Sequence, residues 1–110
     1  MAIYSQTQIE RELDKLAKLV KNGQISESLA RNIHKLVGLE ISQLEIDLAE
    51  TEKDLSGFET QYDMSTTDFF SQWQSGQIDD RMDYVEWASL AQMAENLRKR
   101  LELLKGESQK

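Results

Sequence analysis

Residues 64–87, MSTTDFFSQWQSGQIDDRMDYVEW, interrupt a chain that otherwise has the pattern of long, regular helices. Seven of the eight aromatic residues in the chain lie between Phe58 and Trp87. Negative charge gathers in the same part, because residues 41–95 carry thirteen acidic and two basic residues, a formal charge of −11 against −7 for the whole chain. The sequence therefore concentrates its rings and its acids around one short segment.

This segment predicts a short helix over about residues 65–75. Ser65 is a suitable N-cap, and Met64 and Phe69 stand at the two positions of a hydrophobic staple. Gly76 follows as a stop signal, since glycine readily adopts the left-handed conformation just past a helix end. A helix of this length would turn the chain between the longer helices on either side of it.

Three further helices are predicted, over about residues 8–21, 26–61 and 79–105. Thr7 and Glu10 have capping-box spacing at the start of the first. The last should begin at Asp79 or Asp80, whose carboxylates suit the positive end of the helix dipole. The two longer helices carry apolar residues at alternating spacings of three and four, which is typical of a heptad seam. The seams consist of Ala30, Ile33, Val37, Ile41, Leu44, Leu48, Thr51, Leu55, Phe58 and Tyr62, and of Trp87, Leu90, Ala94, Leu97, Leu101 and Leu104.

The fold prediction is a single all-α domain over residues 1–110. The chain has no proline, so nothing in it removes a backbone donor or blocks a helical turn. Short turns should fold the first helix onto the start of the second, and the last helix back along its other half. These helical hairpins share one long central coiled-coil-like helix, which at ~50 Å needs partner helices along its length. We therefore expect a homodimer in the form of a helical bundle, with its parallel or antiparallel orientation left open.

Composition excludes several classes of function. The chain has no cysteine, and therefore neither a disulfide framework nor a thiolate metal site. The N-terminus does not have the pattern of a secretion signal, and no apolar run approaches the ~20 residues that cross a bilayer. We expect a cytoplasmic protein without membrane contact. The acidic middle section should also repel nucleic acid and attract a basic partner.

No group of residues predicts catalysis or metal binding. Residues 79–83, DDRMD, match the DDxxD pattern that holds Mg²⁺-diphosphate in all-α prenyl synthases, but the chain lacks a second such motif and the length to enclose a substrate. His34 is the only histidine and has no evident partner ligand or nucleophile. The acids of the long helix are interpreted as its solvent-facing side: Glu50, Glu52, Asp54 and Glu59. We predict no catalytic residue, no cofactor and no metal.

The ring cluster has two interpretations that the sequence leaves open. The rings form either a local core alone, or a core together with a surface for another protein. We expect Phe69, Trp73 and Trp87 to contribute to the core in both cases. Phe69 and Phe70 are adjacent and cannot face the same side of a helix. Tyr84 and Trp87 share a predicted helix face with Asp80 and Asp83. Rings mixed with carboxylates suit a basic protein partner. The predicted partner-binding residues are Phe69, Phe70, Trp73, Asp79, Asp80, Asp83, Tyr84, Glu86 and Trp87.

Three segments within about residues 57–105 carry a family resemblance. They are YDMS at 62–65 followed by Phe69, DYVEW at 83–87 and LRKRLELL at 97–104. This pattern resembles that of small acidic helical antitoxin-like proteins of cyanobacteria and archaea, encoded in two-gene toxin–antitoxin-like modules. Two positions depart from the pattern: Asp63 stands where the family tends to have glycine, and Tyr84-Val85 replaces a pair of phenylalanines.

The resemblance implies a protein that binds and neutralises a basic toxin-like partner by covering it. Such a role needs no catalytic group, and an acidic ring-bearing surface would imitate the nucleic-acid substrate of a basic nuclease site. The alternative is a self-associating structural coiled-coil protein without a toxin partner, whose rings are buried in its own dimer.

Overall fold

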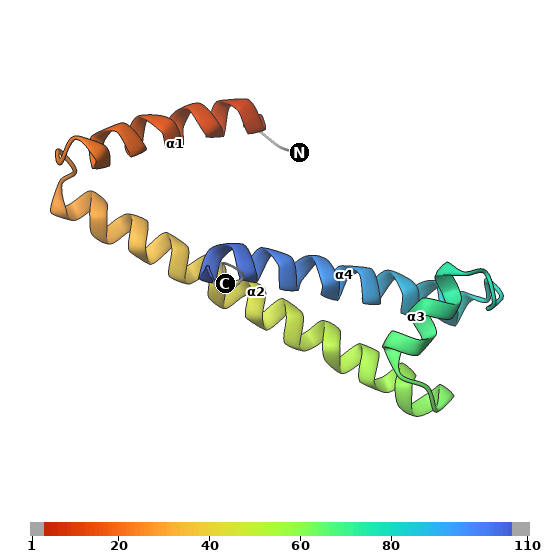
Figure 1. Cartoon of the computed structure of the whole chain (residues 1–110). Helices are drawn as coiled ribbons and strands as arrows, with labels where there is room; N and C mark the ends of the chain where they lie inside the picture. Colours follow the sequence, from red (N-terminus) through yellow and green to blue (C-terminus); the bar gives the residue numbers. More distant parts are fainter. Residues whose placement is uncertain (1–3, 107–110) are drawn as a thin grey trace. The chain divides into compact units, whose positions relative to one another are not determined.

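The computed structural model of the chain describes residues 4–106, which form four helices and no strand (Figure 1). The helices are α1 (Gln6–Lys21), α2 (Glu27–Tyr62), α3 (Thr66–Gln74) and α4 (Met82–Lys105). The predicted all-α class is therefore confirmed for the described residues. The dimeric bundle stays a prediction.

Local capping sets several helix ends close to their predicted positions. At the start of α2, the Ser26 hydroxyl accepts the Leu29 backbone N–H at 3.1 Å. At the start of α3, the Ser65 hydroxyl accepts the Asp68 backbone N–H, also at 3.1 Å. Gly106 ends α4 with a left-handed φ of 70°. Short-range side-chain chemistry therefore accounts for these boundaries.

Helix α4 begins two to three residues after its predicted start at Asp79 or Asp80. An Asp79 carboxylate oxygen accepts the backbone N–H of Arg81 at 3.1 Å, which closes a turn two residues long and keeps the chain out of the helix. The helix begins only at Met82. Asp79 and Asp80 consequently lie in the loop, so Asp80 does not share a helix face with Tyr84 and Trp87.

Asp63 ends α2 in a strained backbone conformation. Its φ of 52° lies in the left-handed region, and the next amide, Met64 N–H, donates to the Glu59 carbonyl at 3.2 Å. This is the hydrogen bond of a helix stop that usually contains glycine. Asp63 tolerates the conformation better than most residues but still pays a steric cost, and it brings negative charge to the negative end of the helix dipole.

Replacing Asp63 with glycine is expected to raise the free energy of unfolding by about 0.5–1 kcal/mol, because glycine adopts this φ without a Cβ clash. Urea denaturation followed by circular dichroism would measure the change. Asp63→Ala is the matched control: it removes the charge but keeps the Cβ atom, and should give no gain. Equal stabilisation by both substitutions would show that charge, and not backbone strain, limits this turn.

The chain divides into two compact units, Met1–Val37 and Gly38–Lys110, with the boundary inside α2. In the first unit, the Ser5 hydroxyl accepts the Gln8 backbone N–H at 3.1 Å, so α1 begins slightly before its predicted start. No residue of α1 is buried. The predicted packing of the first helix onto the start of the second is therefore not confirmed.

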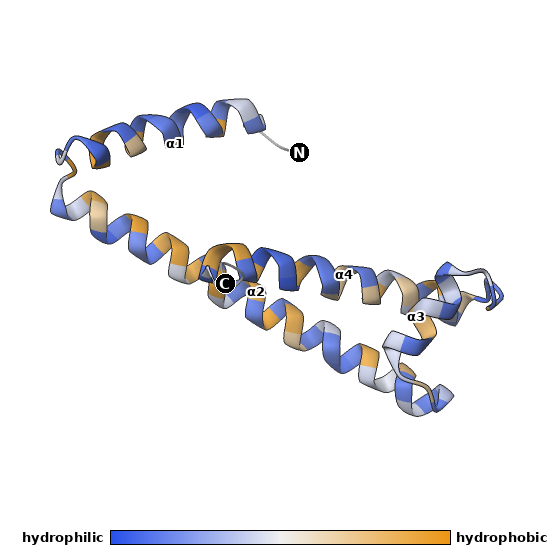
Figure 2. Ribbon diagram, in the orientation of Figure 1, coloured by the Kyte–Doolittle hydropathy of each residue, from blue (hydrophilic) through white to orange (hydrophobic). Residues whose placement is uncertain are grey.

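In the second unit, α4 runs back alongside the latter part of α2 (Figure 1). Arg98 Nη2 lies 3.1 Å from Glu52 Oε2, and Lys105 Nζ lies 2.7 Å from Glu45 Oε2. The ion pair nearer the end of α4 involves the residue nearer the start of α2, so the two helices are antiparallel. Figure 2 shows apolar residues recurring along both helices.

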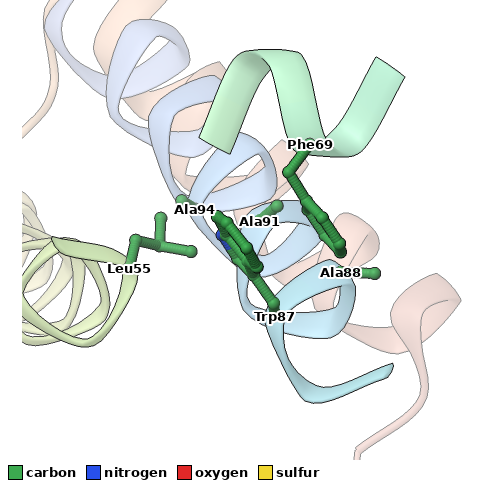
Figure 3. Close-up of a cluster of buried hydrophobic side chains, with 6 residues drawn as sticks. All are labelled: Leu55, Phe69, Trp87, Ala88, Ala91 and Ala94. Atoms are coloured by element: carbon green, nitrogen blue, oxygen red, sulfur yellow. The ribbon is translucent and has the colours of Figure 1, made fainter. Parts of the chain in front are cut away.

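Two hydrophobic clusters hold this unit together. The larger joins α2, α3 and α4, and the smaller joins α2 and α4 nearer the end of α4. Their buried members are Leu55, Phe69, Trp87, Ala88, Ala91 and Ala94 in the first cluster (Figure 3), and Leu44, Leu97 and Leu101 in the second. The seam predictions hold for Leu44, Thr51 and Leu55 on α2 and for Trp87, Ala94, Leu97 and Leu101 on α4. They are wrong for Val37 and Leu104, which are exposed, and they miss Ala88 and Ala91.

Candidate functional site

The centre of the ring cluster is a stack of two aromatic side chains. Trp87 and Phe69 are both 0% exposed, and their rings are parallel within 1° with centroids 3.9 Å apart. Trp87 Nε1–H donates to the Thr66 hydroxyl at 3.0 Å, which satisfies the only polar group of the indole. Figure 3 shows Phe69 of α3 lying against Trp87 of α4, with Leu55 of α2 beside them. Phe69 and Trp87 therefore belong to the core and not to a contact surface.

The other rings lie at the edge of this core and are half-buried. Phe70 and Trp73 on α3 and Tyr84 on α4 all pack against the first cluster while keeping part of their surface in solvent. Arg81 lies over the Tyr84 ring, 4.6 Å from its centroid, which is cation–π geometry. These three rings are available to another molecule.

The predicted acids divide into exposed and engaged groups. Asp79, Asp80 and Glu86 are exposed, and Asp79 Oδ1 lies 3.3 Å from Arg81 Nε. The hydrogen bond from the Arg81 guanidinium lowers the pKa of Asp79. Asp83 is half-buried and accepts a hydrogen bond of 2.5 Å from the Tyr62 hydroxyl. Asp83 therefore connects α4 to the end of α2 as well as contributing charge.

Seven of the predicted residues retain exposed surface, and we refer to this set as the acidic ring surface: Phe70, Trp73, Asp79, Asp80, Asp83, Tyr84 and Glu86. Arg81 connects Asp79 to the Tyr84 ring, but among the described residues no hydrogen bond, ion pair or ring contact connects Asp80 or Glu86 to the rings of α3. A hollow of about 440 Å³ adjoins it, lined by Lys53, Asp54, Gly57, Phe58, Gln61 and Glu86. Asp54 and Phe58 lie outside the predicted site, so the sequence missed this combination of carboxylate and ring.

Sequence reasoning also missed a role for Glu59. The sequence predicts a solvent-facing position for Glu59 on the long helix, but its carboxylate accepts the Thr66 backbone N–H at 2.7 Å. An acid on α2 thus caps the first turn of α3 across seven residues of chain. Ser65, Glu59 and the Trp87–Thr66 hydrogen bond together fix where α3 starts, and thereby place Phe70 and Trp73.

The Tyr62–Asp83 contact gives the site a measurable response to pH. The hydrogen bond to Asp83 and burial raise the pKa of Tyr62 above its ordinary value of 10.0. Because the folded value is higher than the unfolded one, the stabilisation is fully present below the unfolded pKa and is lost as pH rises through the folded pKa. We expect one of the three tyrosines to form tyrosinate late in an absorbance titration of the native protein.

Tyr62→Phe should abolish this late step, and Asp83→Asn should move it to lower pH. If the late step persists in Tyr62→Phe, the assignment to this pair is wrong.

The described residues contain no group of three or more His, Cys, Asp or Glu side chains placed to hold a metal ion. Asp79 and Asp80 precede α4, so the DDRMD motif does not form the helix face that a diphosphate-binding motif uses. Within residues 4–106, no helix is long and apolar enough to cross a membrane. In comparisons with known proteins, the chain matches no family model, no curated protein and no solved structure.

Proposed function

We propose that this protein is a non-enzymatic, antitoxin-like interaction module that binds a basic partner protein through the acidic ring surface. The observation that carries the proposal is the coexistence of exposed carboxylates with half-buried rings around one rigid core. Asp79, Asp80 and Glu86 are exposed in this region, and Arg81 is the one basic residue between Lys53 and Arg98.

The carboxylates and the rings would contribute to binding in different ways, because they differ in burial. Exposed carboxylates steer a basic partner during encounter and disfavour acidic competitors. Half-buried aromatic rings such as Trp73 provide large contact area at low entropic cost, because the core already restricts their rotamers. The Phe69–Trp87 stack fixes α3 against α4 and so presents both groups on one scaffold.

The resemblance to antitoxin-like proteins supports a neutralising role, in which the partner is toxin-like and encoded beside this chain. The alternative, a self-associating structural coiled coil, is supported by a different observation: α1 and the start of α2 leave large apolar side chains exposed. The two functions differ in whether a second kind of protein is bound.

Co-expression with the product of the neighbouring reading frame tests the proposal. The complex is purified on a tag, and its mass is measured by light scattering at several salt concentrations. We expect a stable complex whose affinity falls as ionic strength rises, because exposed charges are screened. Recovery of this chain alone at every salt concentration would contradict the proposal and favour the structural alternative.

A further inference from the structure

The first unit exposes large apolar side chains that are not part of the acidic ring surface. We propose that α1 binds a second copy of this chain. The two α1 helices pair in antiparallel orientation about a two-fold axis. The pairing stripe consists of Ile9, Leu13, Leu16 and Val20. This assigns the dimer contact to α1 and not to the whole length of α2.

Exposure of the stripe motivates the proposal. Leu13 is 58% exposed, Val20 51% and Ile9 46%, and Leu16 is half-buried, although α1 is a well-formed helix with a capped start. Large apolar side chains repeated along one side of a helix typically face another protein surface. In the described part of the first unit, the large apolar side chains that are exposed, apart from Tyr4, are Ile9, Leu13, Leu19, Val20, Leu36 and Val37.

The stripe is short for an interface. Three of its four side chains are about half exposed, whereas a standard interface buries about 800 Å² per partner. We therefore expect a weak dimer, with a dissociation constant in the micromolar range.

The spacing of the stripe fits a two-fold axis. The spacings between successive stripe residues are four, three and four. They are therefore symmetric about a midpoint between Asp14 and Lys15. An antiparallel copy centred there brings Ile9 opposite Val20 of the other copy, and Leu13 opposite Leu16. Every stripe residue then meets an apolar residue, as an isologous contact requires.

Charge selects the antiparallel orientation. Residues 6–14 carry three acids and one base, whereas residues 15–21 carry three lysines and no acid. Antiparallel pairing places the acidic half of one helix beside the basic half of the other, and it also opposes the two helix dipoles. Parallel pairing would place like charges together. The rest of the chain is strongly acidic, so self-association is least opposed at this unit, where residues 1–37 carry formal charge +2.

Sedimentation of the full chain from about 1 to 200 µM tests for the dimer in the expected affinity range. Leu13→Glu should weaken dimerisation at least about 30-fold, because the pairing would place a carboxylate against the apolar side chain of Leu16 in the other copy. Leu103→Glu is the matched control: Leu103 is 76% exposed on α4, and its substitution should leave dimerisation unchanged. Since no residue of α1 is buried, helicity and tryptophan emission should persist in Leu13→Glu. A monomeric wild type, or a Leu13→Glu dimer of unchanged affinity, overturns the proposal.

Cysteine cross-linking tests the orientation, and the natural chain contains no cysteine to interfere. Ile9→Cys and Val20→Cys are each oxidised alone and then as an equimolar mixture. Positions 9 and 9 of an antiparallel pair lie too far apart for a disulfide, but 9 and 20 lie opposite each other. We expect a cross-linked heterodimer from the mixture and none from either variant alone. Efficient cross-linking of Ile9→Cys alone would overturn the antiparallel arrangement.

Discussion

Trp87→Ala should lower the free energy of unfolding by about 3–5 kcal/mol, the largest effect expected from a single substitution in this chain. Trp87 is fully buried and contacts rings from two other helices: its centroid lies 3.9 Å from that of Phe69 and 5.5 Å from that of Phe58. Removing the indole leaves a cavity where α2, α3 and α4 meet. Since small domains are stable by only about 5–15 kcal/mol, this loss would remove a large fraction of the total stability. Urea denaturation followed by circular dichroism would measure the loss.

Two companion variants separate the sources of this stability. Trp73→Ala removes the same side chain from the half-buried edge of the cluster and should cost clearly less. Thr66→Val keeps the shape of the side chain but leaves Trp87 Nε1–H without its acceptor, at a cost of about 1–3 kcal/mol. If Trp87→Ala costs no more than Trp73→Ala, the stack is not the centre of the fold.

Reversing two charges should nearly abolish partner binding while leaving the fold intact. Asp80→Lys combined with Glu86→Lys is expected to weaken the complex at least about 100-fold, or ~2.7 kcal/mol, because a basic partner would then meet like charge. Both side chains are exposed and lie outside the buried clusters, so the loss should come from recognition. Asp83 is unsuitable for this purpose, since its substitution would break the hydrogen bond from Tyr62.

Glu40→Lys combined with Glu95→Lys gives the same change in net charge at exposed positions outside the acidic ring surface. This control should weaken binding only slightly, by a general electrostatic effect that salt screens. Titration calorimetry with the purified partner measures both variants. Equal losses in the two double variants would show that the partner senses overall charge and does not dock on the acidic ring surface.

Helix existence and many helix ends could be predicted because they depend on nearby residues. Ser26 and Ser65 cap helices through amides three residues away, and Gly106 supplies the left-handed φ at the end of α4. The start of α4 could not be placed by the same reasoning. Asp79 has the charge of a first-turn residue, but its side chain competes with the helix by bonding the Arg81 amide.

The division of the candidate site into core and surface depends on contacts between distant residues, which periodicity does not specify. The sequence assigns Phe69 and Trp87 both to the core and to the partner-binding residues. Only the packing of α3 against α4 decides between the two. Ala88 and Ala91 were missed because alanine adds little to an apolar pattern, yet its small size lets α4 approach its neighbours closely. The role of Glu59 also depends on tertiary structure. Its carboxylate can accept the Thr66 amide only because the chain turns back at Asp63.

The boundary between the two units within α2 has a kinetic consequence. All three buried side chains of this helix, Leu44, Thr51 and Leu55, lie after the boundary. Backbone amides in residues 31–37 should therefore exchange with deuterium through local fraying, whereas those beyond Leu44 should exchange only when α2 and α4 separate. Protection of the amides from exchange would therefore rise along α2. A second copy bound to the first unit would reduce this difference by protecting the first part of the helix.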